Sequence, residues 1–146
     1  MKTKIAWVQP NFQQGPKEFN AHYLPYSAGV IWSYALTDPW IKENFECTDM
    51  VWRRDAVEEV AQKLKVNDVV AFSTYVWNHQ YNYALARRVK ELNPQCLIVT
   101  GGPEVAITDP DLFVKHPWMD AAVKMEGELV FSQILKEYGK IGRAHV

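Results

Sequence analysis

Short apolar runs alternate along most of the chain with longer segments in which apolar residues recur every three or four positions. The short runs are bounded by turn residues and predict strands. They lie at 4–8, 45–52, 68–74, 96–100 and 120–125. The longer segments have the period of an amphipathic helix. They predict helices at 27–36, 55–65, 78–92, 109–116 and 128–139.

This alternation of strands and helices predicts the fold class. The strands are short and apolar on both faces, which is typical of a parallel sheet covered by helices on both sides. Right-handed crossovers between parallel strands then give a doubly wound arrangement. We therefore expect an α/β fold with a doubly wound, five-stranded parallel sheet, flavodoxin-like with strand order 2-1-3-4-5, in one domain spanning residues 1–140.

Three helices carry further local signals. Asp55 and Glu58 have the spacing of a capping box at the start of the helix at 55–65. Gly139 is expected to end the last helix as its C-cap. The helix at 27–36 has apolar residues on nearly every side, so it is either mostly buried or packs against something outside this chain.

The end of the chain differs from the rest. Residues 141–146, IGRAHV, follow the expected cap at Gly139 without any structural pattern. The peptide looks like one reading frame of a common sequencing adapter. We therefore expect residues 141–146 to be a non-native tail and leave them out of the predicted domain.

Charge and cysteine usage exclude several classes of protein. The formal net charge is -1 with acids and bases interspersed, which gives no reason to expect nucleic acid or a membrane surface as a partner. No apolar run approaches the roughly 20 residues that span a bilayer. Cys47 and Cys96 are far apart and form no metal knuckle, so a reduced, cytoplasmic protein is expected.

In open parallel sheets, ligands bind beyond the carboxyl ends of the strands. Gly101 and Gly102 lack a Cβ there, so a bulky ligand could approach the main chain, and Asn78 is expected to cap the following helix. For each position a structural role is the alternative: a tight turn, backbone hydrogen bonds or rim packing. The candidate cofactor-binding residues are Gln9, Pro10, Asn11, Ser73, Thr74, Tyr75, Trp77, Asn78, Gly101, Gly102, Pro103, Glu104, Glu126, Gly127 and Glu128.

Several catalytic and phosphate-binding motifs are absent from the sequence. No G-x-G-x-x-G follows the first strand, and no G-x-x-x-x-G-K-[ST] occurs. Trp7, Val8 and Gln9 stand where a phosphorylation receiver has paired acids. We expect no self-sufficient catalytic apparatus, no catalytic residue and no protein metal ligand in this chain.

The stretch FSTYVWNHQYNYALARRVKELNPQCLIVTGGPEV and the later DAAVKMEGELVFSQIL together resemble the amino-terminal cobalamin-binding domain of radical SAM enzymes. The matching features are a serine turn with Trp-Asn after the third strand, Gly-Gly-Pro-Glu-Val after the fourth, and Gly-Glu before the last helix. The resemblance implies a cobalamin across the carboxyl edge of the sheet. Its nucleotide tail would lie beside Gly101, Gly102 and the hydroxyls of Ser73 and Thr74.

This chain lacks two features that proteins with such a domain can contain. The segment QPNFQQG has no histidine, and His22 follows without the D-x-H-x-x-G spacing, so the resemblance implies cobalt without a protein imidazole. It also implies a following radical SAM domain, in which C-x-x-x-C-x-x-C holds an iron-sulfur cluster that binds S-adenosylmethionine. We expect this chain to be a fragment truncated before that domain, from a parent that transfers methyl groups or rearranges carbon skeletons.

Two alternatives remain open from the sequence. The chain could be a stand-alone flavodoxin-like module that binds a nucleotide or a partner protein and no cobalamin. It could also be a small hydrolase or transferase with Glu104 or Glu126 as its base.

Overall fold

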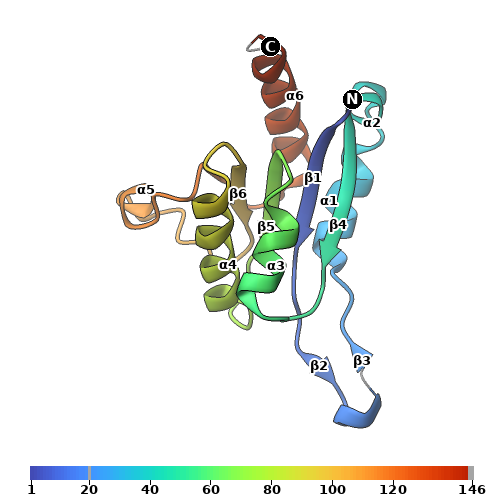
Figure 1. Cartoon of the computed structure of the whole chain (residues 1–146), viewed down its shortest axis with the longest axis vertical. Coiled ribbons are helices and arrows are strands. Elements are labelled where there is room, and N and C mark those ends of the chain that lie inside the picture. Colours follow the sequence, from blue (N-terminus) through green and yellow to red (C-terminus); the bar gives the residue numbers. More distant parts are fainter. Residues whose placement is uncertain (20, 145–146) are drawn as a thin grey trace.

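The computed structural model describes residues 1–19 and 21–144, and its centre is a parallel sheet (Figure 1). The sheet has five strands in the order β4-β1-β5-β6-β7. The strands are β1 (Thr3–Val8), β4 (Phe45–Val51), β5 (Val69–Ser73), β6 (Leu97–Gly101) and β7 (Ala121–Ala122). Numbered along the chain, this order is 2-1-3-4-5, which confirms the predicted doubly wound, flavodoxin-like arrangement.

Helices cover both faces of this sheet. In Figure 1, α3 and α4 lie in front of it, and α1 lies on the opposite side. One side therefore carries α3 (Val57–Leu64) and α4 (His79–Leu92), and the other carries α1 (Tyr26–Ala35), α2 (Pro39–Asn44) and α6 (Glu128–Ala144). A short helix, α5 (Leu112–Lys115), belongs to the connection that leads along the chain from β6 to β7.

Each face of the sheet has its own buried core, because successive side chains of a strand point to opposite faces. Ala6 and Val8 of β1 join the core beneath α3 and α4. Ile5 and Trp7 of the same strand join the core beneath α1, α2 and α6. This division explains why the strands read as continuous apolar runs and not as alternating ones.

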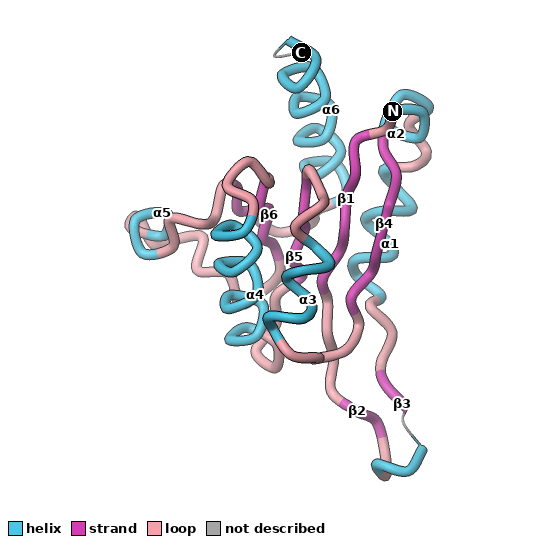
Figure 2. The backbone as a smooth tube through the Cα atoms, viewed as in Figure 1, coloured by secondary structure: helices cyan, strands magenta, loops and turns pink. Residues whose placement is uncertain are grey.

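A two-stranded arm projects from the carboxyl edge of the sheet, below β1 in Figure 2. It consists of β2 (Gln13–Gln14), a 3-10 turn at Lys17–Phe19 and β3 (Ala21–His22). Gln13 pairs with His22 and Gln14 with Ala21 in antiparallel register. The sequence predicted only a polar loop here, because a ladder of two residue pairs is too short to show a hydrophobic period.

Local predictions at helix ends were less accurate than the element order. Helix α2 was missed, although Asp38 caps it by accepting hydrogen bonds from the Trp40 and Ile41 amides. The capping box is wrong: α3 begins at Val57 without a side-chain cap, and Asp55 lies 4.0 Å from Arg53 instead. The predicted end of the last helix at Gly139 is also wrong, because α6 continues to Ala144.

The expected non-native tail falls partly on this extension. Residues 141–144 are helical, and His145 and Val146 lie outside the described residues. The origin of the tail therefore stays a prediction.

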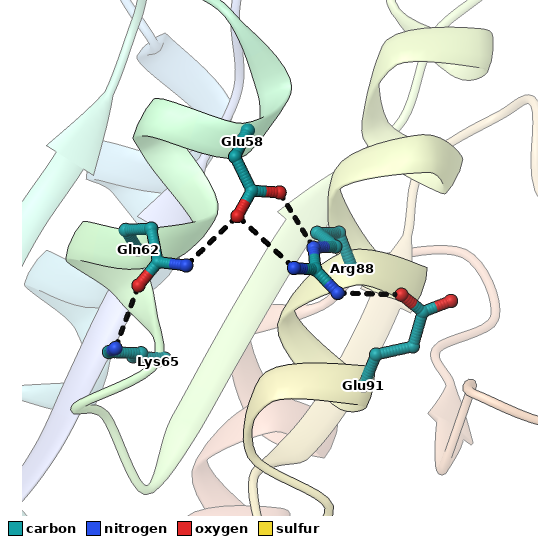
Figure 3. A network of polar contacts seen from close by, with 5 residues as sticks. All are labelled: Glu58, Gln62, Lys65, Arg88 and Glu91. Carbon is teal, nitrogen blue, oxygen red and sulfur yellow. Dashed lines mark hydrogen bonds and ion pairs between the residues drawn. The ribbon is translucent and has the colours of Figure 1, made fainter.

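A polar network joins the exposed sides of α3 and α4 (Figure 3). Arg88 donates from Nε to Glu58 at 2.7 Å and from Nη1 to Glu91 at 3.1 Å. Gln62 donates to Glu58 at 2.9 Å and accepts from Lys65 at 2.7 Å. The hydrogen bonds from Arg88 and Gln62 lower the pKa of Glu58 to about 2. The network fixes α3 against α4 on the face opposite α1.

Candidate functional site

A cavity of about 550 Å³ lies at the carboxyl edge of the sheet, on the face covered by α1 and α6. The strands form its base, α1 and α6 form its sides, and the loops after β6 and β7 form its rim. Most of the lining is apolar. The lining residues are Trp7, Tyr26, Ser27, Val30, Ile31, Ala71, Phe72, Ser73, Tyr75, Val99, Gly101, Gly102, Pro103, Val105, Ile107, Val123, Met125, Glu126, Gly127, Glu128 and Phe131.

One group of the sequence-predicted residues lines this cavity. Ser73 and Gly101 are directly paired in the β5–β6 register, and the Thr74 amide donates to the Gly101 carbonyl at 2.8 Å. The structure therefore brings the ends of these strands to one wall, as the sequence predicted. The members of this group are Ser73, Tyr75, Gly101, Gly102, Pro103, Glu126, Gly127 and Glu128.

The two strand-end glycines have different roles. Gly102 has a φ of +105°, and a Cβ there would lie 2.3 Å from the Thr74 carbonyl oxygen and 2.7 Å from its amide nitrogen. A Cβ on Gly101 would make only ordinary contacts with Val123, at 3.5 Å from its Cβ and 3.8 Å from its carbonyl oxygen. Gly102 is thus required by the protein's own backbone. Only Gly101 leaves room on the cavity wall that a side chain could take.

A second group of predicted residues lies beside the cavity and not in it. Its members are Gln9, Pro10, Asn11, Thr74, Trp77, Asn78 and Glu104. Gln9 Oε1 accepts from the Ala28 amide at 2.8 Å and so fixes the first turn of α1. Thr74 is completely buried, and Glu104 is exposed with its amide donating to the Thr74 carbonyl at 3.3 Å.

Asn78 takes the predicted N-cap position of α4, but its side chain holds the loop after β5 and does not cap the helix. It occupies the N-cap position of α4 but makes no side-chain cap hydrogen bond. Its Oδ1 accepts from the Tyr75 amide at 2.8 Å, and its Nδ2 donates to the Pro10 and Ser73 carbonyls, each at 3.1 Å. The buried Asn78 side chain therefore links by hydrogen bonds the segments that follow β1 and β5.

Tyr75 and Trp77 form an aromatic stack at the rim. Their ring centroids are 4.6 Å apart and the planes differ by 5°. Trp77 Nε1 donates to Asn11 Oδ1 at 3.0 Å, and Asn11 Nδ2 donates at 3.1 Å to the carbonyl of Tyr23, the residue after β3. The Tyr75 hydroxyl lies 2.5 Å from Ser27 Oγ at the start of α1. These bonds fix both rings in place, and Trp77 is still 38% exposed.

Sequence reasoning missed the base of the cavity. Trp7 is 3% exposed, and its ring packs 4.6 Å from the Phe131 ring. Among the described residues, its Nε1 is a buried donor without a hydrogen-bond partner. Ile31 and Val123 complete the apolar wall. A tryptophan in a buried strand indicates core packing, and the strand pattern carries no sign of a hollow beside it.

Histidines and other metal ligands are not gathered at this edge. Within residues 1–19 and 21–144, no group of three or more His, Cys, Asp or Glu side chains could hold a metal ion. None of the described cavity-lining residues is a histidine, and His22 packs instead 5.3 Å from the Trp52 ring. Over the same described ranges, no helix is both long and apolar enough to cross a membrane.

Comparison with known proteins identifies the family of the chain. A family model described as "B12 binding domain" matches residues 36–135. The chain is 39% identical over 79% of its length to 2-(S-pantetheinyl)-carbapenam-3-carboxylate methyltransferase of Streptantibioticus cattleyicolor. It is 36% identical over 77% of its length to the cobalamin-dependent radical SAM methyltransferase TokK of Streptomyces tokunonensis. The match covers 17% of each of these relatives.

Solved structures support the fold alone. A CheY-like protein (TadZ) of Pseudomonas aeruginosa PAO1 superposes with a TM-score of 0.53 at 14% identity, over 95% of this chain and 94% of that one. The family match and the two methyltransferases confirm the resemblance to the cobalamin-binding domain of radical SAM enzymes. This chain belongs to the B12-binding domain family.

Proposed function

We propose that this domain binds cobalamin with the nucleotide tail of the cofactor detached from cobalt and inserted in the cavity between the sheet and α1 and α6. The observation that supports this most directly is the cavity itself, which opens at the carboxyl edge where open α/β sheets bind ligands. Its volume of about 550 Å³ lies within the usual range for small-molecule sites, roughly 300–1,000 Å³.

The lining fits the chemistry of such a tail. Phe131, Ile31 and Val123 offer apolar surface to an aromatic base, and the missing Cβ of Gly101 keeps the wall open beside them. Hydroxyls on Ser73 and Ser27 supply the few polar groups that orient a ligand in an apolar site. These residues would hold the tail.

The corrin ring would lie over the same edge, outside the cavity. The Tyr75–Trp77 stack supplies a fixed, partly exposed aromatic surface next to the cavity rim. With no histidine among the described lining residues, an aromatic surface and not an imidazole would face the lower side of the corrin. Cobalamin bound in this way supplies the methyl-carrying cobalt chemistry, and the protein binds and orients it.

We further propose that the chain is part of a radical SAM methyltransferase, because the two relatives above carry methyltransferase names. The iron-sulfur cluster, S-adenosylmethionine and the catalytic domain would belong to protein outside this chain. Helix α1 buries only Ala28 and Ala35 among its described residues, and Tyr34, which is not part of the cavity lining, is exposed, so the outer side of the helix is available to that domain. The proposed domain is residues 1–140, with 141–146 non-native.

The two cysteines support a reducing compartment. Cys47 and Cys96 are both free thiols, and free thiols persist in the cytoplasm. We therefore propose a cytoplasmic location for the protein.

The test is retention of hydroxocobalamin by the purified domain through gel filtration. The wild-type domain should elute with the red chromophore at about one cofactor per chain. Gly101→Leu, which places a side chain on the cavity wall, should lose it. Gly29→Leu is the matched control, because a Cβ at Gly29 meets nothing within 4 Å and this residue is not part of the cavity lining.

Two results would contradict the proposal. One is a colourless wild-type domain, and the other is retention that Gly101→Leu does not change while circular dichroism confirms folding. Parallel incubation with flavin mononucleotide tests the alternative of a nucleotide-binding module. Flavin retained in place of cobalamin would favour that alternative.

A further inference from the structure

The indole N–H of Trp7 is a buried hydrogen-bond donor that the described protein does not satisfy. Such donors are rare in folded proteins, because burying one without an acceptor forfeits the hydrogen bonds it made to water. A phenylalanine at this position would pack against Phe131 without that loss. The presence of an indole therefore calls for an acceptor that the described residues do not provide.

Trp7 lies at the base of the cavity. Its strand neighbours on the same face are apolar, and Ala71 is its register partner on β5. The nearby Ser27 hydroxyl is already engaged with the Tyr75 hydroxyl at 2.5 Å. A ligand that fills the cavity therefore meets the Trp7 ring in a largely apolar setting, where a hydrogen bond is strong.

We propose that Trp7 Nε1 donates a hydrogen bond to the base of the cofactor's nucleotide tail and so makes the site selective for tails with a ring-nitrogen acceptor. This inference rests on the proposed function. In cobalamin, the tail base is a benzimidazole, and the ring nitrogen that can bind cobalt has a free in-plane lone pair once the tail detaches. That nitrogen loses water on entering an apolar cavity and needs a donor there. Trp7 and the benzimidazole would each satisfy the other.

Ser73 is the rival donor. It lines the same cavity, and its hydroxyl can rotate toward a ligand. The geometry favours Trp7, because the indole N–H has no other function in the described structure and cannot turn toward solvent as a hydroxyl at the rim can. Comparing Trp7→Phe with Ser73→Ala shows which of the two side chains donates the hydrogen bond.

The experiment measures dissociation constants of wild type and both variants for two cofactors. One is cobalamin. The other is p-cresolylcobamide, whose phenolic tail has no ring nitrogen and does not bind cobalt. Trp7→Phe should weaken cobalamin binding about five- to tenfold, the equivalent of one net hydrogen bond. It should leave p-cresolylcobamide binding within about twofold, which corrects for any change in packing. Ser73→Ala should weaken both cofactors to a similar, small extent.

Each other result overturns the inference in a distinguishable way. If Trp7→Phe weakens both cofactors equally or neither, the indole makes no selective bond, although the proposed function stands. If only Ser73→Ala shows a cobalamin-selective loss, the donor is Ser73. If the wild-type domain binds neither cofactor, the proposed function fails together with the inference. Thermal melts of both variants establish that each is folded before binding is measured.

Discussion

Replacing Gly102 by alanine tests whether this glycine serves the protein's own backbone. The new Cβ would lie 2.3 Å from the Thr74 carbonyl oxygen and 2.7 Å from the Thr74 amide nitrogen. Both atoms belong to the main chain that crosses from β5, and the same amide already donates to the Gly101 carbonyl at 2.8 Å. Relief of the clash must therefore move β5 relative to the turn after β6.

The expected loss follows from two terms. A non-glycine residue at a φ of +105° is strained by about 1–3 kcal/mol. Overpacking against rigid neighbours adds about 1–3 kcal/mol. The reduced freedom of alanine in the unfolded chain offsets less than about 1 kcal/mol. Gly102→Ala should thus lower the free energy of unfolding by about 1–6 kcal/mol.

Urea denaturation followed by circular dichroism measures this loss, with the free energy of unfolding obtained by linear extrapolation. Gly101→Ala is the matched control, because its Cβ makes only ordinary contacts with Val123, at 3.5 and 3.8 Å, and the substitution should change stability by less than about 1 kcal/mol. The reasoning is refuted if the two variants are equally stable. It is also refuted if Gly101→Ala is the less stable one.

Three further predictions concern other parts of the fold. Iodoacetamide at neutral pH should label exposed Cys47 and spare Cys96, because burial raises the pKa of the Cys96 thiol to about 12. Peptide mass measurements that find Cys96 labelled in the folded domain would contradict this. Because Arg88 lowers the pKa of Glu58 from 4.5 to about 2, the stability from this pair is complete above about pH 4.5 and is lost as the pH falls to about 2. In thermal melts, the difference in melting temperature between wild type and Glu58→Gln should shrink over that pH window, and a difference that does not change with pH would contradict this. Asn78→Ala removes four side-chain hydrogen bonds, three of them buried, and should cost about 2–4 kcal/mol in urea denaturation, so a loss below about 1 kcal/mol would argue against its tying role.

The sequence predicts the element order well because the two periodicities are strong. The residue pattern at Val69–Ser73 fits only a buried strand, and the pattern at His79–Leu92 fits only an amphipathic helix. Their alternation then leaves few topologies open. The carboxyl edge, where Ser73 and Gly101 meet, follows directly from that topology.

The cavity could not be predicted in the same way. Trp7 and Phe131 are both apolar and buried, and a sequence does not say whether such residues fill a core or border a hollow. The role of Gly102 depends on Thr74, which is distant in sequence and reaches it only through the β5–β6 register. The roles of Asn78 and Gln9 likewise depend on backbone groups of other segments.

The most direct test of the central claim, that the cofactor's tail leaves cobalt for the cavity beside Trp7 and Gly101, is the electron paramagnetic resonance spectrum of the domain loaded with cob(II)alamin. A benzimidazole nitrogen bound to cobalt splits the cobalt lines into triplets. The account predicts that this nitrogen splitting disappears when the domain binds the cofactor and that free cob(II)alamin in the same buffer keeps it. Protein-bound cofactor that retains the triplets would place the tail on cobalt and outside the cavity, and would contradict the account.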